Sequence, residues 1–505
     1  MNAGEVTIKE PAKPKYSVKV PNPLLLGSVV TAIAFWFASN RDFGPDGYFI
    51  PMKGVLLVVL GMAPGLAYFR RVRLNPSSVE PLPYLPILGL IFAIYYGLPV
   101  LIRDQISFMS LHPSVQSISE ALDFAIEGWV CLLIGVYVIG PRLFAASKNR
   151  PLRVNWDEQR ARKLGLALVA VGSISTVIGE LVELPVSLMQ IFRLLGLMLR
   201  LGLGIFILID LRGTSSRGWR FMLWFVILPI FMFMHLRTGQ IGAFVRPFAF
   251  VMMLIWACRF RLPWVSLGVA VLVAILLRGT AAEFRSMLWR SSKVAELGAM
   301  ERSALYIDTA RQNLTTRPGE TIEKAVDLIS SRTAQLALFA HATHRTPEAV
   351  PYWAGESYKT LASSFIPRIV WRDKPTKNVG QRFGHRYSVI HIDDKTTAVN
   401  LPQLVELFVN FGPMGVWIGM FGMGLLLSYA GMKLNSSAAG PGTLLVGATI
   451  YSEIINIESD FSLVFGALLQ TTVIVYFVLR LCGSKVIESE LGSSPLRQAP
   501  VPRTQ

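Results

Sequence analysis

The sequence predicts an all-α polytopic integral membrane protein with about 12 transmembrane helices, and three observations lead to this fold class. Hydrophobic residues make up 52% of the 505 residues, whereas charged residues make up only 16%. The mean hydropathy is +0.48. Apolar segments long enough to cross a bilayer recur along most of the chain. Multi-span membrane proteins combine these values over such a length, so a soluble fold is excluded.

The apolar segments divide the chain in order. A polar segment, residues 1–22, precedes the first apolar run, which starts too late for a cleaved signal peptide and is expected to remain as a membrane helix. A Ser/Pro-rich tail, residues 483–505, is expected to be disordered. The expected transmembrane helices cover residues 23–40, 48–69, 82–102, 121–145, 164–185, 191–211, 220–236, 241–258, 262–278, 412–432, 438–456 and 460–482.

Basic residues in the short loops predict the orientation of these helices. Four lysines precede the first helix, and further clusters, 70–73, 148–163, 212–220 and 259–261, follow the second, fourth, sixth and eighth helices. All of these segments fall on one side, which we therefore assign to the cytoplasm together with both termini. Cytoplasmic retention is the first explanation for the formal net charge of +17, and no nucleic-acid partner is expected.

One large loop, residues 279–400, interrupts the series of short connections. It separates the nine helices within residues 23–278 from the three within 401–482, and the alternation places it on the periplasmic side. Within it, segments 301–313 and 319–343 carry apolar residues at spacings of three and four. This periodicity predicts short amphipathic helices on the outer face of the membrane.

The stretch "FIPRIVWRDKPTKNVGQRFGHRY", residues 365–387, concentrates positive charge late in this loop. Topology does not explain these cations, because they lie outside the cytoplasm. Arginine forks, lysines and neighbouring aromatic rings at a lipid–water boundary suit an anionic headgroup. The alternative is a basic belt that binds anionic lipids without further function. The basic side chains of this stretch are Arg368, Arg372, Lys374, Lys377, Arg382, His385 and Arg386.

Other arginines lie where water is scarce. Arg237 lies at the outer end of the seventh helix, and Arg278 and Arg285 leave the ninth helix seven residues apart, on nearly one face. They either bind a ligand or extend to the outer surface. Arg193 and Arg200 show the same spacing.

Carboxylates near the membrane are the natural partners of such arginines. For Arg193 and Arg200 the expected partners are Glu180 or Glu183. Glu406 lies where the chain re-enters the bilayer, and is either part of an ion pair or a general base. The "NFG" run that follows, residues 410–412, marks a break before the tenth helix.

Several motifs are absent from the sequence. It contains no Walker loop, HExxH, Gly-rich dinucleotide turn, Cys/His metal spacing or DxD-like acidic pair. We therefore expect neither a cofactor nor a metal site.

The order "FIPRIVWRDKP", "VGQRF" and "TTAVNLPQLVELFVNFGPMGVWIGMFGMGLL" resembles the bacterial Wzy-type O-antigen and exopolysaccharide repeat-unit polymerases. Members typically show a "PR…W…KP" run late in the large periplasmic loop, then an acidic residue and "NFG". Arg237 in "LRTGQIGAF" is similar to an arginine motif of the same family. The resemblance covers most of residues 230–430, whereas the N-terminal half matches only in hydropathy.

The resemblance implies a GT-C-like, metal-independent and inverting glycosyltransferase of the bacterial inner membrane. Such an enzyme joins undecaprenyl-diphosphate-linked repeat units for lipopolysaccharide, capsule or exopolysaccharide, with a chain-length regulator as a possible partner. It carries over Arg237, Arg368 and Lys374 as diphosphate ligands, and spacing adds Arg278, Arg285 and Arg372. Glu406 matches the acidic position, and His385 is the alternative base, because an imidazole titrates near neutral pH.

Two other functions remain open at this point. An O-antigen ligase, which transfers finished glycan to an acceptor, shares the topology and the basic loop. A lipid-linked-sugar flippase or transporter would be expected to show two related halves. The long loop destroys such symmetry, so this function is the less favoured one.

Overall fold

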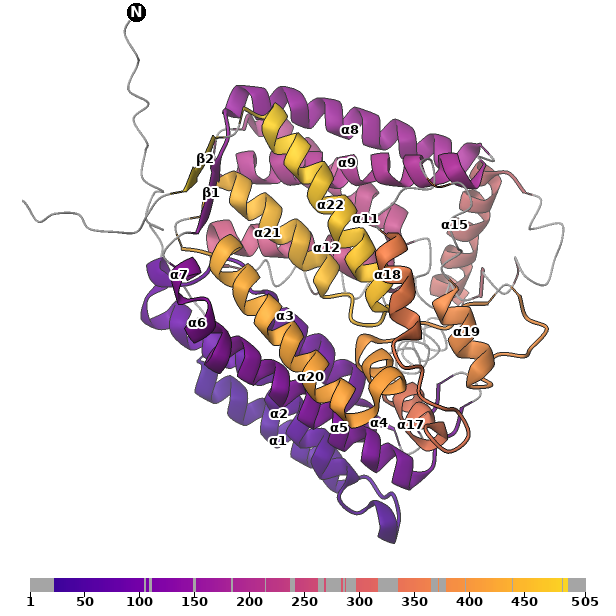
Figure 1. Cartoon of the computed structure of the whole chain (residues 1–505). Helices are drawn as coiled ribbons and strands as arrows, with labels where there is room; N and C mark the ends of the chain where they lie inside the picture. The colour runs from indigo at the N-terminus through magenta and orange to yellow at the C-terminus, as the bar shows by residue number, and fades with distance from the viewer. Residues whose placement is uncertain are drawn as a thin grey trace, which may run out of the picture.

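The computed structural model describes most of the chain. Within the described residues the protein is built of helices, with one short two-stranded ribbon (Figure 1). The described residues are 22–103, 106–108, 111–148, 151–182, 185–213, 215–236, 241–261, 268, 283–284, 287, 297–316, 335–364, 371, 378–395, 397–437, 439–483 and 485–488.

The first helices form one group around α2 and α5. The Ser114 hydroxyl begins α5 by accepting the Ser117 N–H, and single π-helical turns, η3 and η4, interrupt two of the helical runs. The elements of this group are α1 Pro23–Ser39, η1 Pro45–Gly47, α2 Ile50–Leu74, η2 Pro76–Ser78, α3 Tyr84–Phe92, η3 Ala93–Gly97, α4 Pro99–Ile102, α5 Val115–Ile134, η4 Gly135–Ile139, α6 Gly140–Leu143 and α7 Ala145–Lys148.

The next helices form a second group, in which α8 packs along α9 and α9 packs on α12. Asp157 begins α8, because its carboxylate accepts the N–H of Arg160. The elements of this group are α8 Glu158–Leu181, α9 Val186–Leu211, α10 Arg217–Phe221, η5 Met222–Ile227, α11 Leu228–Leu236 and α12 Ile241–Arg259.

The three C-terminal helices are shared between the two groups (Figure 1). Helix α20, Gln403–Leu434, packs on α5 of the first group, whereas α21, Pro441–Ile454, and α22, Phe461–Leu481, join the second group. Helices α20 and α5 are in close contact at Gly424. A Cβ atom at this position would overlap the carbonyl oxygen of Leu132, so the contact depends on glycine. Helix α20 thereby spans the region between the two groups.

A two-stranded antiparallel ribbon ties the start of the second group to the end of the chain. Strand β1, Leu152–Asn155, pairs with β2, Lys485–Glu488, in the register Leu152 to Glu488. Residues 485–488 belong to the tail that we expected to be disordered, and for them this expectation is wrong. The reason is that β1 offers an unpaired edge at the end of the bundle where α22 stops.

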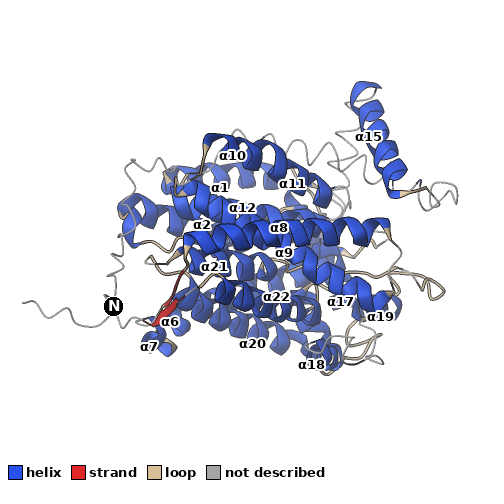
Figure 2. Ribbon diagram, turned by 90° about the horizontal axis from the view of Figure 1, so that it is seen from above, coloured by secondary structure: helices blue, strands red, loops and turns tan. Residues whose placement is uncertain are grey.

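The helices of the large loop gather at the opposite end of the bundle from this ribbon (Figure 1). The expected helix at 301–313 is confirmed as α15, which extends away from the other helices in Figure 2. The elements of the loop are α15 Ala299–Thr316, α17 Gln335–Arg345, η6 Glu356–Tyr358, α18 Lys359–Ser364 and α19 Val379–Arg386.

Helix α17 departs from the expectation of an amphipathic helix on the membrane surface. Its residues from Gln335 to Ala340 are all buried, because the helix is inserted against α5 and α20. The apolar spacing at 319–343 is therefore satisfied by protein contacts, at least over the described part, which begins at Gln335. Periodicity alone does not distinguish a lipid surface from a protein surface.

Seven described helices are long and apolar enough to cross a membrane. The expected helices at 23–40 and 82–102 are present as shorter apolar helices, and those at 241–258 and 438–456 correspond to α12 and α21. The segment 262–278 lies mostly outside the described residues. The protein is thus a helical protein with several membrane-spanning candidates. The seven are Pro45–Leu74, Val115–Leu143, Glu158–Gly179, Leu194–Leu211, Arg217–His235, Gln403–Leu434 and Phe461–Leu481.

Candidate functional site

The end of the basic stretch folds as α19 and carries two cations on its accessible side. Val379 and Phe383 anchor this helix in the core, being 2% and 0% exposed. Arg382 and Arg386, one turn apart, both reach Glu356: Nη1 of Arg382 lies 2.7 Å from Oε1, and Nη1 of Arg386 lies 3.3 Å from Oε2. One carboxylate thus bridges two guanidinium groups.

Arg386 has further support besides this ion pair. Its Nη2 donates to the Pro351 carbonyl oxygen at 3.2 Å, and its guanidinium lies 5.2 Å from the centre of the Trp353 ring. A cation over an indole face is favourable. Arg386 is consequently held in place by groups other than Glu356.

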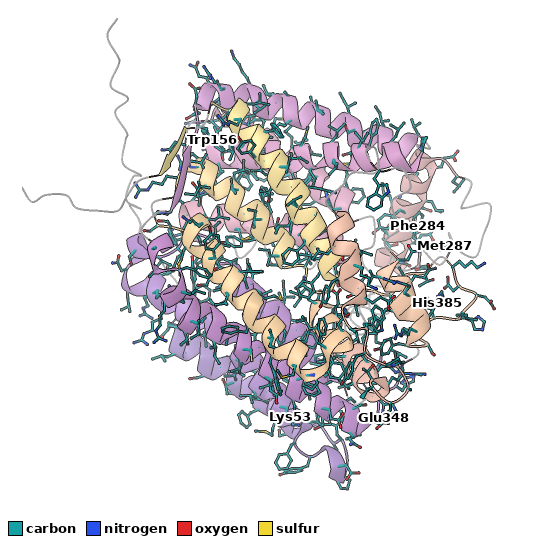
Figure 3. The ribbon with its side chains drawn as sticks, viewed as in Figure 1. Lys53, Trp156, Phe284, Met287, Glu348 and His385 are labelled. Atoms are coloured by element: carbon teal, nitrogen blue, oxygen red, sulfur yellow. The ribbon has the colours of Figure 1, made fainter. Side chains whose placement is uncertain are left out.

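His385 lies between these arginines on α19, at the end of the bundle opposite Trp156 (Figure 3). Its Nε2 lies 2.9 Å from the carbonyl oxygen of Asp394. A carbonyl oxygen only accepts, so Nε2 carries the proton and donates it. In the neutral imidazole this leaves Nδ1 as a proton acceptor, which is the tautomer that a general base needs.

A second histidine, His341 on α17, fixes the backbone next to this site. Its Nε2 donates to the Tyr387 carbonyl oxygen at 2.8 Å, and the Tyr387 hydroxyl bonds to Thr346 at 2.6 Å. Burial lowers the pKa of His341, and the hydrogen bond to Tyr387 only partly opposes this effect. His341 therefore stays neutral and locks the C-terminal end of α19.

The loop that carries Glu356 is attached to α20 through its backbone. Trp353 N–H donates to the Val409 carbonyl at 2.9 Å, and Ala354 N–H donates to the Asn410 carbonyl at 3.1 Å. The Asn410 side chain accepts the Gly355 N–H at 3.0 Å and donates to Ser357 Oγ at 2.8 Å. The position of this loop is accordingly set by Asn410, the first residue of the "NFG" run.

The predicted break at "NFG" is present within α20. Gly412 has φ +64° and ψ −151°, values that are not helical. A Cβ atom there would lie 2.8 Å from the Tyr352 hydroxyl, so the position requires glycine for both reasons. The preceding Phe411 stacks on Tyr358 with the ring centres 6.1 Å apart. The break thus shapes the surface against which the Glu356 loop packs.

Glu406 is fully buried beneath this loop. Its Oε2 accepts the backbone N–H of Phe461 at 2.7 Å, at the first residue of α22. Its exposed fraction is 0%. The geometry therefore fits a positioning role better than direct contact with a substrate hydroxyl.

A buried arginine, Arg200, and the partly exposed Arg246 share one buried carboxylate between α9, α12 and α21. Arg200 Nη2 contacts Glu453 Oε1 at 2.6 Å, and Arg246 Nη1 contacts Glu453 Oε2 at 3.1 Å. Arg200 was expected to pair with Glu180 or Glu183, and this expectation is wrong. Its guanidinium instead meets α21, because that helix packs on both α9 and α12. The side chains of Arg193 and Glu180, and all of Glu183, lie outside the described part.

An apolar groove runs between α20 and α22, next to the Glu356 loop. Its volume is about 560 Å³, within the range of small-molecule sites. Tyr358 of η6 lines it, together with Leu407, Met423, Phe461 and Phe465. The apolar groove therefore lies next to the loop whose Glu356 contacts Arg382 and Arg386 of α19.

The structure describes two of the eight predicted site residues. His385 and Glu406 do not bond to each other but are connected by one loop: Glu356 contacts α19, and Ser357 contacts Asn410, one turn after Glu406. Sequence reasoning missed Glu356, for which no spacing signal exists. The other six residues, Arg237, Arg278, Arg285, Arg368, Arg372 and Lys374, lie outside the described residues.

Comparison with known proteins gives one family. The model of a family described as a domain of unknown function, DUF8712, matches residues 145–485. The matched region begins at α7 and ends in β2, so it includes the candidate site but not α1–α6. No curated protein and no solved structure matches the chain.

Proposed function

The chain belongs to the family described as a domain of unknown function (DUF8712), and we propose that this member is a polymerase that joins undecaprenyl-diphosphate-linked repeat units at the periplasmic face of the bacterial inner membrane. The observation that carries the proposal is the pairing of α19, with its two arginines and His385, with an adjacent apolar groove. A lipid diphosphate has an anionic headgroup, which arginines bind, and an apolar chain, which fits a hydrophobic groove.

The proposed topology has 12 transmembrane helices, cytoplasmic termini and a periplasmic large loop. Two features support it. Strand β1 of the ribbon lies within the basic segment 148–163, and β2 follows the end of α22; the charge pattern places both in the cytoplasm. The loop helices α17, α18 and α19 lie at the other end of the bundle (Figure 1).

In the proposed reaction, His385 acts as the base. A sugar hydroxyl of the acceptor attacks the anomeric carbon of the donor glycan, and the bond from that carbon to the diphosphate oxygen breaks. The hydroxyl proton passes to Nδ1 of His385, whose Nε2–H remains on the Asp394 carbonyl. The diphosphate leaves with the electron pair, and arginines stabilise its charge. A single displacement inverts the anomeric configuration.

The basic residues outside the described part complete this proposal. Arg368, Arg372 and Lys374 precede α19 in the sequence. Arg237 follows the expected seventh helix, Arg278 ends the expected ninth helix, and Arg285 lies at the start of the large loop. We assign all six to the diphosphate. Glu406 is given a positioning role, since its side chain holds the start of α22 against α20.

Reconstitution tests the proposed function. Purified protein incubated with a lipid-diphosphate-linked repeat unit is expected to produce a ladder of lipid-linked oligomers spaced by one unit. His385→Ala should abolish the ladder. Glu406→Gln should lower activity only to the extent that it lowers the free energy of unfolding. Transfer of finished polymer to a separate acceptor would indicate a ligase instead. Movement of the unit across vesicles without elongation would indicate a flippase.

A further inference from the structure

The Glu356 carboxylate occupies a position that suits an anion from outside the protein. Its two oxygens each contact one guanidinium group, from Arg382 at 2.7 Å and Arg386 at 3.3 Å. Two guanidinium groups one helical turn apart form a binding site for a bidentate oxyanion, such as a carboxylate or a phosphate. Glu356 therefore stands in for such an oxyanion.

The fold does not depend on this carboxylate. The backbone before Glu356 is held by Val409 and Asn410, the Ser357 side chain after it is held by Asn410, and α19 is held by buried Phe383 and Tyr387, both 0% exposed. The ion pair itself is accessible to solvent: the side chains of Arg382, Arg386 and Glu356 are 42%, 33% and 39% exposed. Ion pairs between solvent-exposed side chains contribute little to the stability of a fold. A purely structural role is thus a weak explanation for the bridge.

The two arginines remain suitable for a ligand when Glu356 leaves. Arg386 keeps its hydrogen bond to the Pro351 carbonyl and its position over the Trp353 ring. Glu356 follows Gly355, which has φ +86°, at the start of the short η6 turn. The carboxylate lies at the end of a flexible side chain, so it can swing away while its backbone stays in place.

We propose that Arg382 and Arg386 form an oxyanion site that Glu356 occupies in the free protein, and that the diphosphate of the substrate displaces this carboxylate. Glu356 is then an internal competitor that lowers the affinity for diphosphate. The identity of the ligand rests on the proposed function, but competition for the site does not require any glycosyl transfer.

Binding of inorganic diphosphate to the full chain in detergent tests this proposal by calorimetry. Glu356→Gln removes the competing charge and is expected to tighten binding about 3- to 10-fold, given the strength of exposed pairs. Glu348→Gln is the matched control, because it removes the same charge from an exposed residue at the same end of the bundle (Figure 3). The control is expected to stay within about twofold of wild type.

Two further variants keep the test decisive. Glu356→Asp keeps the charge but shortens the side chain, so it should tighten binding in the same direction by a smaller factor. The gain from Glu356→Gln should vanish when Arg382 and Arg386 are both replaced by Ala. Weaker or unchanged binding in both Glu356 variants, with wild-type thermal midpoints, would overturn the proposal. If Glu356→Gln tightens diphosphate binding but the wild-type protein forms no oligomer ladder, the oxyanion site is supported and the polymerase function is rejected.

Discussion

Replacing Asn410 with Ala should release the Glu356 loop from α20. Asn410 is 1% exposed, and its side chain accepts the Gly355 N–H at 3.0 Å and donates to Ser357 Oγ at 2.8 Å and to the Glu406 carbonyl at 2.7 Å. The Ser357 hydroxyl can rotate to another partner. The Gly355 N–H loses the acceptor that the Asn410 side chain provides.

The expected cost follows from these three contacts. Each hydrogen bond contributes about 1 kcal/mol net, and an abandoned buried donor costs about 1–3 kcal/mol. Because the Glu406 carbonyl is a helix acceptor in its own right, we expect a loss of about 2–3 kcal/mol in the free energy of unfolding. Denaturant titration in detergent micelles measures this loss, and hydrogen exchange measures the protection of the Gly355 amide.

Asn435→Ala is the matched control, because Asn435, the C-cap residue of α20, is also buried and also bonds to backbone. Its amide contacts the Leu82 N–H and carbonyl, both at 2.7 Å, at the other end of the helix. It should lower stability by about 2 kcal/mol and leave Gly355 protected. The reasoning is refuted if Asn410→Ala exchanges its Gly355 amide at the wild-type rate.

Two other predictions concern buried charge and pH. Burial lowers the pKa of His341 in the folded chain. Between this lowered pKa and about 6.5, the unfolded chain binds more protons than the folded chain. The free energy of unfolding should therefore fall on acidification through this window. Thermal midpoints at about pH 7.5 and 5.5 should differ less in His341→Gln, which keeps a donor for the Tyr387 carbonyl; an unchanged difference would exclude His341 as the cause. Glu453→Leu should cost about 3–5 kcal/mol in denaturant titration, because Arg200 and Arg246 lose their shared carboxylate. Arg246→Ala should cost less, since its side chain is 33% exposed and Arg200 keeps its partner; equal losses would contradict this account.

Local patterns predicted much of the helical framework. The composition predicted a helical membrane protein, and periodicity predicted the helix at α15. The "NFG" run predicted the break that Gly412 provides with its positive φ. Each of these features depends on residues that are close in sequence, so the chain displays them without reference to its other parts.

The candidate site was only partly predictable for the same reason. The sequence marked His385 and Glu406 but gave no sign that Glu406 accepts the N–H of Phe461 at the start of α22 or that Glu356 bridges two arginines. Both contacts form between segments that are separated along the chain. A sequence shows which charges need partners without showing which partners the fold brings near.

By itself, then, the sequence determined the class of the protein, the break at Gly412, and the concentration of cations before and within α19. Only the tertiary structure decided the pairings: Arg200 meets Glu453 across 253 residues, β1 meets β2, and α17 is buried instead of lying on lipid. The physical reason is that desolvation makes unpaired buried charges and open strand edges costly. Which group removes that cost depends on how the helices pack.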